Sequence, residues 1–162
     1  EPSGRRPTAT KFTSAYARDK TFMSPKSYQL LEHTADIYIR VKAKDLKSLF
    51  VNSAEAMFDI STSAKKPISK EKITFPISQT AVNKEELFIN WLNELLSLSA
   101  VKKTIFTDFK IKKFSENTIE ADVSGISAEN FEIKTEIKAA TYHDLVLKSE
   151  GKKWIAEVIF DV

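Results

Sequence analysis

From residue 32 to residue 42 the chain reads Glu32-His33-Thr34-Ala35-Asp36-Ile37-Tyr38-Ile39-Arg40-Val41-Lys42. Its second half alternates, with Ile37, Ile39 and Val41 on one face, which is the pattern of a half-buried β-strand. A histidine and two carboxylates therefore stand at the entrance to a strand, where a sheet could hold them rigidly for binding. Alternatively, Thr34 and Asp36 only close a turn and His33 packs beside the strand.

The composition limits the chemistry that this chain can perform. Its 162 residues are enough for one domain with its own core, and the longest apolar runs are far too short to span a bilayer. The chain has no cysteine and only two histidines, His33 and His143. Thiolate sites and three-histidine sites are therefore excluded, and any bound metal must be held mainly by oxygen.

The net charge of +3 is distributed unevenly along the sequence. Residues 1–27 carry six basic and two acidic side chains, which leaves 19 basic and 20 acidic side chains for the rest of the chain. We interpret residues 1–27 as a flexible basic N-terminal extension and residues 28–162 as the folded domain. The nearly neutral domain argues against broad binding of a phosphate backbone by its folded surface.

Two helices are predicted in the first two thirds of the chain. Asp45 is placed to cap a helix whose apolar residues recur at three- and four-residue spacing, and Asn83 with Glu86 marks a second helix start. In this second helix the polar side, including Asn93, is expected to face solvent. The residues between the helices are predicted to form a polar loop from 61 to 69 and then a strand over Ile73–Ile77. Pro76 favours an edge position for that strand.

From Thr104 onward the pattern alternates and predicts a series of strands, one of which includes Phe131, Ile133 and Ile137. Two early helices followed by many strands indicate an α+β fold. We expect the two helices to pack on a mostly antiparallel or mixed sheet in a two-layer domain.

The sequence ends in the run Val158-Ile159-Phe160-Asp161-Val162. If this last strand pairs with the first, Asp36 and Asp161 converge. Two carboxylates, with main-chain oxygen and a terminal carboxylate from Val162, would suit a hard cation such as Ca²⁺ or Mg²⁺. Spacing alone is weak support, since two aspartates this far apart occur in many chains.

A third candidate stretch is Glu136-Ile137-Lys138-Ala139-Ala140-Thr141-Tyr142-His143. Lys138 is expected to point away from the core, and the strand is expected to bend near Tyr142 and His143. A catalytic interpretation makes His143 a general base and Lys138 an electrostatic clamp; the alternative is an exposed strand face. With glycine only at positions 4, 125 and 151, no glycine-rich phosphate loop is possible.

Residues 32–37, 136–143 and 158–162, in this order, closely resemble the signature stretches of the archease family, and the likeness runs from about Tyr28 to Val162. The resemblance implies a cytoplasmic protein cofactor (nuclear in some eukaryotes) rather than an enzyme. Such a protein assists an RtcB-type RNA ligase in tRNA splicing by promoting its guanylylation by GTP and repeated turnover. Contact with tRNA halves and GTP would be indirect, through the ligase, and no membrane is involved.

The resemblance also implies roles for particular residues. A divalent cation, usually Ca²⁺ with Mg²⁺ or Mn²⁺ as alternatives, would be held by Asp36, Asp161 and Val162, and Lys138 would act in ligase activation. We add His33 and His143 as residues near this acidic tip that would serve the partner or its activation.

Two other functions remain open from the sequence. One is an RNA-binding or chaperone module in tRNA processing that acts through residues 1–27 and the lysine-rich segment from Lys102 to Lys113. The other is a small metal-dependent hydrolase that uses Asp36, His143 and Asp161.

Overall fold

The computed structural model describes residues 9–10, 28–31, 36–65 and 71–162. In this part of the chain the elements follow one another as β1 (Ala9–Thr10), β2 (Tyr28–Leu31), β3 (Ile37–Ala43), α1 (Leu46–Ser61), β4 (Thr62–Ala64), β5 (Ile73–Thr80), α2 (Lys84–Lys102), β6 (Thr104–Phe114), β7 (Thr118–Ser127), a 3₁₀ turn η3 (Ala128–Asn130), β8 (Phe131–Ile133), β9 (Ala139–Glu150) and β10 (Lys153–Asp161).

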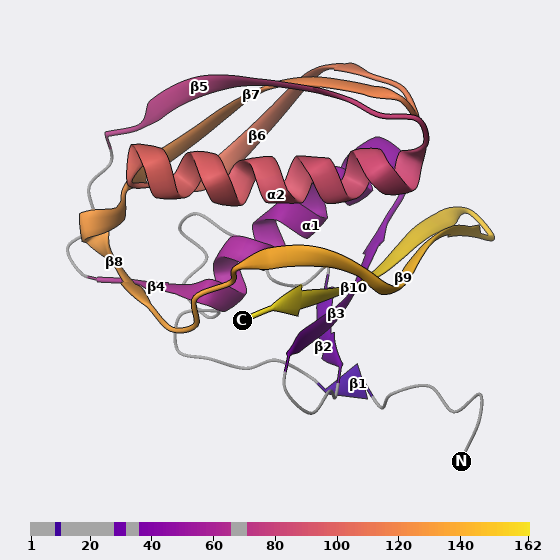
Figure 1. Ribbon diagram of the computed structural model, residues 1–162, viewed down its shortest axis with the longest axis horizontal. Coiled ribbons are helices and arrows are strands. Elements are labelled where there is room, and N and C mark those ends of the chain that lie inside the picture. The colour runs from indigo at the N-terminus through magenta and orange to yellow at the C-terminus, as the bar shows by residue number, and fades with distance from the viewer. Residues whose placement is uncertain (1–8, 11–27, 32–35, 66–70) are drawn as a thin grey trace.

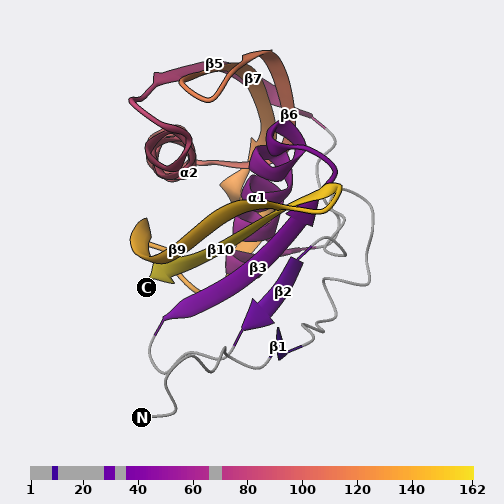
Figure 2. The same ribbon diagram turned by 90° about the vertical axis from the view of Figure 1, so that its right-hand side faces the viewer.

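The two helices lie between two antiparallel sheets (Figures 1 and 2). One sheet has the strand order β1-β2-β3-β10-β9 and the other has the order β5-β7-β6, while β4 and β8 form a separate pair. Helix α1 packs against β3 and β10 on one side and against β6 on the other, and α2 contacts β9 and β6. The predicted α+β class with antiparallel strands is confirmed, and Pro76 lies in the edge strand β5 as expected.

Both helices begin where the sequence predicted. The Asp45 carboxylate accepts a hydrogen bond of 2.7 Å from the backbone N–H of Ser48. At the start of α2, the Asn83 side chain accepts from the Glu86 N–H at 2.8 Å, and Glu86 in turn accepts from the Val82 N–H at 2.9 Å. The bonds from Ser48 and Glu86 satisfy N–H groups that the first turn of a helix leaves without partners, and the third ties the residue before the cap to that turn.

The core lies where the helices face each other and the sheets. Phe50 of α1 packs edge-to-face on Phe88 of α2, with ring centroids 5.2 Å apart. The fully buried Trp91 donates its indole N–H to the carbonyl oxygen of Phe50 at 2.9 Å. This hydrogen bond satisfies the buried indole N–H of Trp91 and the carbonyl of Phe50 together. It therefore fixes how the two helices approach each other.

The structure differs from the sequence-based expectation in three short segments. Ala9–Thr10, inside the predicted extension, pairs with β2, while the rest of residues 1–27 lies outside the described part of the chain. The polar-loop prediction is wrong for Thr62–Ala64, which forms β4, because this segment has no apolar alternation to reveal a strand. Strand β8 ends at Ile133, so the buried Ile137 belongs to an irregular segment.

Glu55 on α1 leads to a prediction for stability. Burial, and secondarily the Asp108 carboxylate, raise the pKa of Glu55 from its ordinary value of 4.5 to about 7. Between about pH 4.5 and pH 7 the carboxyl of Glu55 is therefore more protonated in the folded chain than in the unfolded one. The free energy of unfolding consequently falls as the pH rises through this range. We expect Glu55→Gln to raise the free energy of unfolding by about 1–2 kcal/mol at pH 8, with allowance for partial solvent screening.

The same substitution is expected to change stability little at pH 5. Urea denaturation at the two pH values measures the difference, with Glu116→Gln in an exposed turn as the control for loss of a surface charge. A Glu55→Gln effect that is equal at pH 5 and pH 8 would contradict this account.

Candidate functional site

Strands β3 and β10 bring the two ends of the folded domain together. They pair antiparallel from Trp154 opposite Ala43 to Phe160 opposite Ile37. Asp36 and Asp161 each lie one residue beyond that last pair, so both stand at the same end of the ladder. Phe160 is fully buried, and alternation therefore assigns Asp161 to the opposite, outer face, where it is exposed, while Asp36 is half-buried just before β3. The predicted pairing of the first and last strands is confirmed.

The start of β9 runs beside Asp161. The backbone N–H of Lys138 donates to the carbonyl oxygen of Asp161 at 2.7 Å, and Ala139 is the ladder partner of Asp161. One step further, the Thr141 hydroxyl donates to the carbonyl oxygen of Ile159 at 2.9 Å. The side chains of Lys138 and Asp161 are both exposed. The second and third signature stretches thus lie side by side.

Asn93 on α2 positions this part of β9, which the sequence analysis did not predict. Its side-chain oxygen accepts from the Ala140 N–H at 2.8 Å, and its side-chain nitrogen donates to the Ala140 carbonyl at 3.2 Å. The expectation that Asn93 faces solvent is therefore wrong. Strand β9 lies at the edge of its sheet, so its outward backbone groups have no neighbouring strand to bond. At Ala140 the side chain of Asn93 makes the two hydrogen bonds that such a strand would make.

His143 lies beyond an irregularity in β9. The β9–β10 ladder pairs Ile159 with Thr141 and resumes only at Glu157 with Val146, and within this interval Asp144 has a φ of 52°. The bend predicted near Tyr142 and His143 is confirmed. His143 is exposed, and its Nε2 atom lies 3.5 Å from the Asp144 carboxylate, which makes an ion pair when the imidazole is protonated.

His33 belongs to residues 32–35, which lie outside the described part of the chain, so its predicted place beside the aspartates stays a prediction. Within the described residues, no group of three histidine, aspartate or glutamate side chains is arranged to hold a metal ion. The predicted metal site requires only two side-chain carboxylates, from Asp36 and Asp161, with main-chain oxygen from Val162. These oxygen donors, at one end of the ladder, are the type of ligand that a hard divalent cation prefers.

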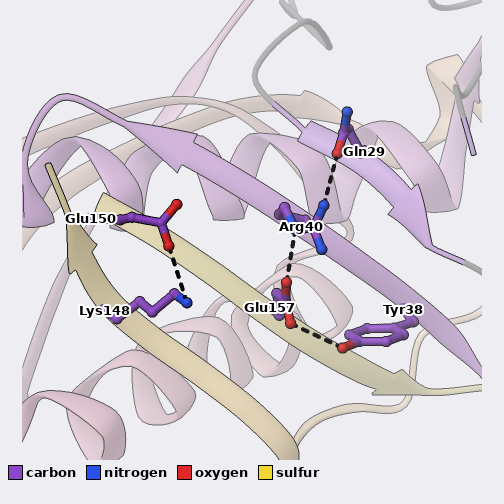
Figure 3. A network of polar contacts seen from close by, with 6 residues as sticks. All are labelled: Gln29, Tyr38, Arg40, Lys148, Glu150 and Glu157. Carbon is purple, nitrogen blue, oxygen red and sulfur yellow. Dashed lines mark hydrogen bonds and ion pairs between the residues drawn. The ribbon is translucent and has the colours of Figure 1, made fainter. Parts of the chain in front are cut away.

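A polar network covers the middle of the same outer face (Figure 3). Glu157 is only 2% exposed, and its carboxylate accepts from Arg40 Nε at 2.8 Å and from the Tyr38 hydroxyl at 3.1 Å. Arg40 also reaches the side-chain oxygen of Gln29 at 3.5 Å. The network joins β2, β3 and β10, and so fixes the strands that carry Asp36 and Asp161.

The described part of the chain contains no helix long and apolar enough to cross a membrane.

Comparison with known proteins gives a consistent result. The model of the archease protein family (MTH1598/TM1083) matches residues 28–162. A protein archease from Methanosarcina acetivorans is 34% identical over 143 residues, which is 85% of this chain and 97% of the relative. A protein archease from Pyrococcus furiosus is 31% identical over 143 residues, 85% of this chain and 99% of the relative.

Solved structures show the same fold. The solution structure of Methanobacterium thermoautotrophicum protein 1598 superposes with a TM-score of 0.60 at 25% identity, covering 85% of this chain and 99% of that protein. The crystal structure of a Thermotoga maritima archease, described as a possible chaperone, gives 0.59 at 23% identity over 82% of this chain and 94% of that one. The family match over residues 28–162, together with these relatives, shows that this chain belongs to the archease family.

Proposed function

We propose that this chain is a protein activator of an RtcB-type RNA ligase in tRNA splicing, which promotes GTP-dependent guanylylation of the ligase and so permits multiple turnover. The observation that carries the proposal is the pairing of β3 with β10, which puts Asp36 and Asp161 at the same end of one ladder. Membership of the archease family supports it.

In this proposal the acidic end of the ladder, defined by Asp36, Asp161 and Val162, is the part that enters the ligase's nucleotide site. These residues would hold a divalent cation, Ca²⁺ or alternatively Mg²⁺ or Mn²⁺, which when bound supplies positive charge for the phosphates of GTP. The chain itself positions the two carboxylates through the β3–β10 ladder and the Glu157 network.

Lys138 is the cation that this chain offers at the same place. Its backbone is bonded to Asp161 while its exposed ammonium group is available to a phosphate or a carboxylate of the partner. His33 and His143 would contact the ligase from the two flanking segments. Because a docked protein can order GTP without reacting with it, activation needs positioning and electrostatics only.

The proposal is tested by mixing the purified full chain with a matching ligase and radiolabelled GTP, and by following the covalent guanylate on the ligase. We expect a higher initial rate of guanylylation and several ligation events per ligase molecule. Identical rates and turnover numbers with and without this chain would overturn the proposal, as would phosphoester hydrolysis by this chain alone at a comparable rate.

A substitution at Lys138 tests its separate role. We expect Lys138→Gln to lower the stimulated rate of guanylylation about fivefold. The glutamine keeps the backbone hydrogen bond to Asp161 but removes the positive charge beside the acidic end of the ladder. Lys148→Gln, in the strand β9 that follows Lys138, removes a charge that is paired with Glu150 at 3.2 Å, and it is expected to retain full stimulation. Equal rates for the two variants would remove Lys138 from the mechanism.

A further inference from the structure

At the end of the β3–β10 ladder opposite to Asp36 and Asp161, the fold gathers lysines from four separate segments. A cleft of about 470 Å³ is lined by residues that include Lys42, Lys44, Lys152 and Lys153. A second hollow of about 400 Å³ is lined by residues that include Lys47, Lys112 and Lys113, and its lining begins at Asp45, the residue after Lys44 of the first cleft. These seven lysines, all exposed, are named here the lysine band.

Three carboxylates near the lysine band have bonded partners outside it. Asp45 caps α1, Glu157 is paired with Arg40, and Glu150 is paired with Lys148. Lys112 of the band is paired with Asp122 at 3.5 Å. The other six lysines form no ion pair with a described residue. Asp45 lies near Lys44 and Lys47, and the ladders set Lys113 opposite Glu120 and Lys153 opposite Glu150. With seven lysines facing these few carboxylates, the band presents an excess of positive charge.

We propose that the lysine band binds the phosphate backbone of RNA. The two hollows span more than a single phosphate group, which favours a polymer over a free nucleotide. Lysines act as compact point charges that neutralise successive phosphates and release their counterions. Binding of this kind needs no base-specific contact.

One feature of the surface argues against an acidic protein as the partner, and another argues against single-stranded RNA. The exposed large apolar side chains of the described residues are Ile73, Val82, Val101, Ile133 and Tyr142, and none of them lies in the lysine band. Protein interfaces need an apolar centre and are depleted in lysine there. Tyr28, at the wall of the first cleft, is buried and donates its hydroxyl to Asp59, so it offers no exposed ring for stacking of single-stranded bases.

These features point to the backbone of folded or double-helical RNA. From Ala43 to Ile37 the β3–β10 ladder extends for roughly 20 Å, which keeps bound phosphates away from the acidic end. The inference does not depend on ligase activation, because it concerns the opposite end of the molecule.

The test uses the full chain and a fluorescein-labelled RNA hairpin of about 24 nucleotides in anisotropy titrations at several salt concentrations. We expect the triple variant Lys44→Gln, Lys152→Gln, Lys153→Gln to bind about tenfold more weakly at 50 mM salt. Its slope of log affinity against log salt concentration should also be smaller, by about 2–3, because each lost phosphate contact contributes about 0.9.

The matched control, Lys65→Gln, Lys102→Gln, Lys103→Gln, removes the same charge from exposed lysines outside the band, two of them at the end of α2. It should bind within about twofold of the unaltered chain. Three results would each overturn the proposal: no binding by the unaltered chain at 50 mM salt, equal losses in both triple variants, or equally tight binding of polyglutamate of matched charge. Guanylylation of the ligase without RNA should be unchanged by the band variant, which separates failure of this inference from failure of the proposed function.

Discussion

Replacing Asp36 or Asp161 with asparagine is expected to lower the stimulation of ligase guanylylation about 100-fold, close to the rate without this chain. Asparagine has nearly the same size and can keep the same backbone, so the β3–β10 ladder should form as before. What is lost is one of the two negative charges on which cation binding by oxygen ligands depends. Because both side chains serve one site, the double variant should be no worse than either single variant.

Two measurements make this prediction specific to the acidic end. Calorimetric titration with Ca²⁺ should show weaker binding in both single variants, whereas urea denaturation should show stability near that of the unaltered chain. Glu150→Gln, an exposed carboxylate at the other end of the β9–β10 hairpin, is the control and should stimulate fully. If Asp36→Asn and Asp161→Asn stimulated as well as the unaltered chain, the acidic end would have no part in activation.

The second large effect is expected at Gly125, in the central strand β7 of the β5-β7-β6 sheet. A Cβ atom added there would lie 2.2 Å from the carbonyl oxygen of Ile105 and 2.8 Å from its carbonyl carbon. These are backbone atoms of the paired strand β6, so relief of the clash must displace the ladder itself. We expect Gly125→Ala to lower the free energy of unfolding by about 3 kcal/mol, and the melting temperature by roughly 6–12 °C.

Gly151 provides the comparison for this substitution. It occupies the β9–β10 turn with a φ of 64° and has no atom within 4 Å of an added Cβ. Gly151→Ala should therefore cost only about 1 kcal/mol, from backbone strain. A larger loss at Gly151 than at Gly125 in urea denaturation would show that the close approach to Ile105 is relieved at little cost.

Short-range signals in the sequence correctly predicted the starts of both helices and one edge strand. Asp45 and the Asn83–Glu86 pair marked both helix starts, because a capping side chain acts within one turn. Pro76 indicated an edge strand because it lacks an N–H group. The pairing of the first and last strands was predicted as a condition for Asp36 and Asp161 to meet, and the register of Phe160 with Ile37 fulfils that condition.

The features that the sequence did not predict depend on contacts between distant residues. Alternation identifies the buried face of a strand but not its neighbour, so the division of the strands into two sheets around the helices was not apparent. Asn93 was assigned to a solvated helix face because its partner, the backbone of Ala140, cannot be recognised from side chains. The nearly neutral sum of charges likewise concealed the separation of the lysine band from the two aspartates.

The position of β10 between β3 and β9 has a consequence for synthesis of this protein. Arg40 and Glu157 are 117 positions apart, and β3, which pairs with β2 on one edge, gains its partner on the other edge only after β10 has left the ribosome. Until then the nascent chain carries an unpaired edge of β3, the kind of surface that promotes intermolecular strand pairing. Late closure over such a long stretch of chain also implies slow folding. Chaperone demand during translation should therefore be greatest just before β10 emerges.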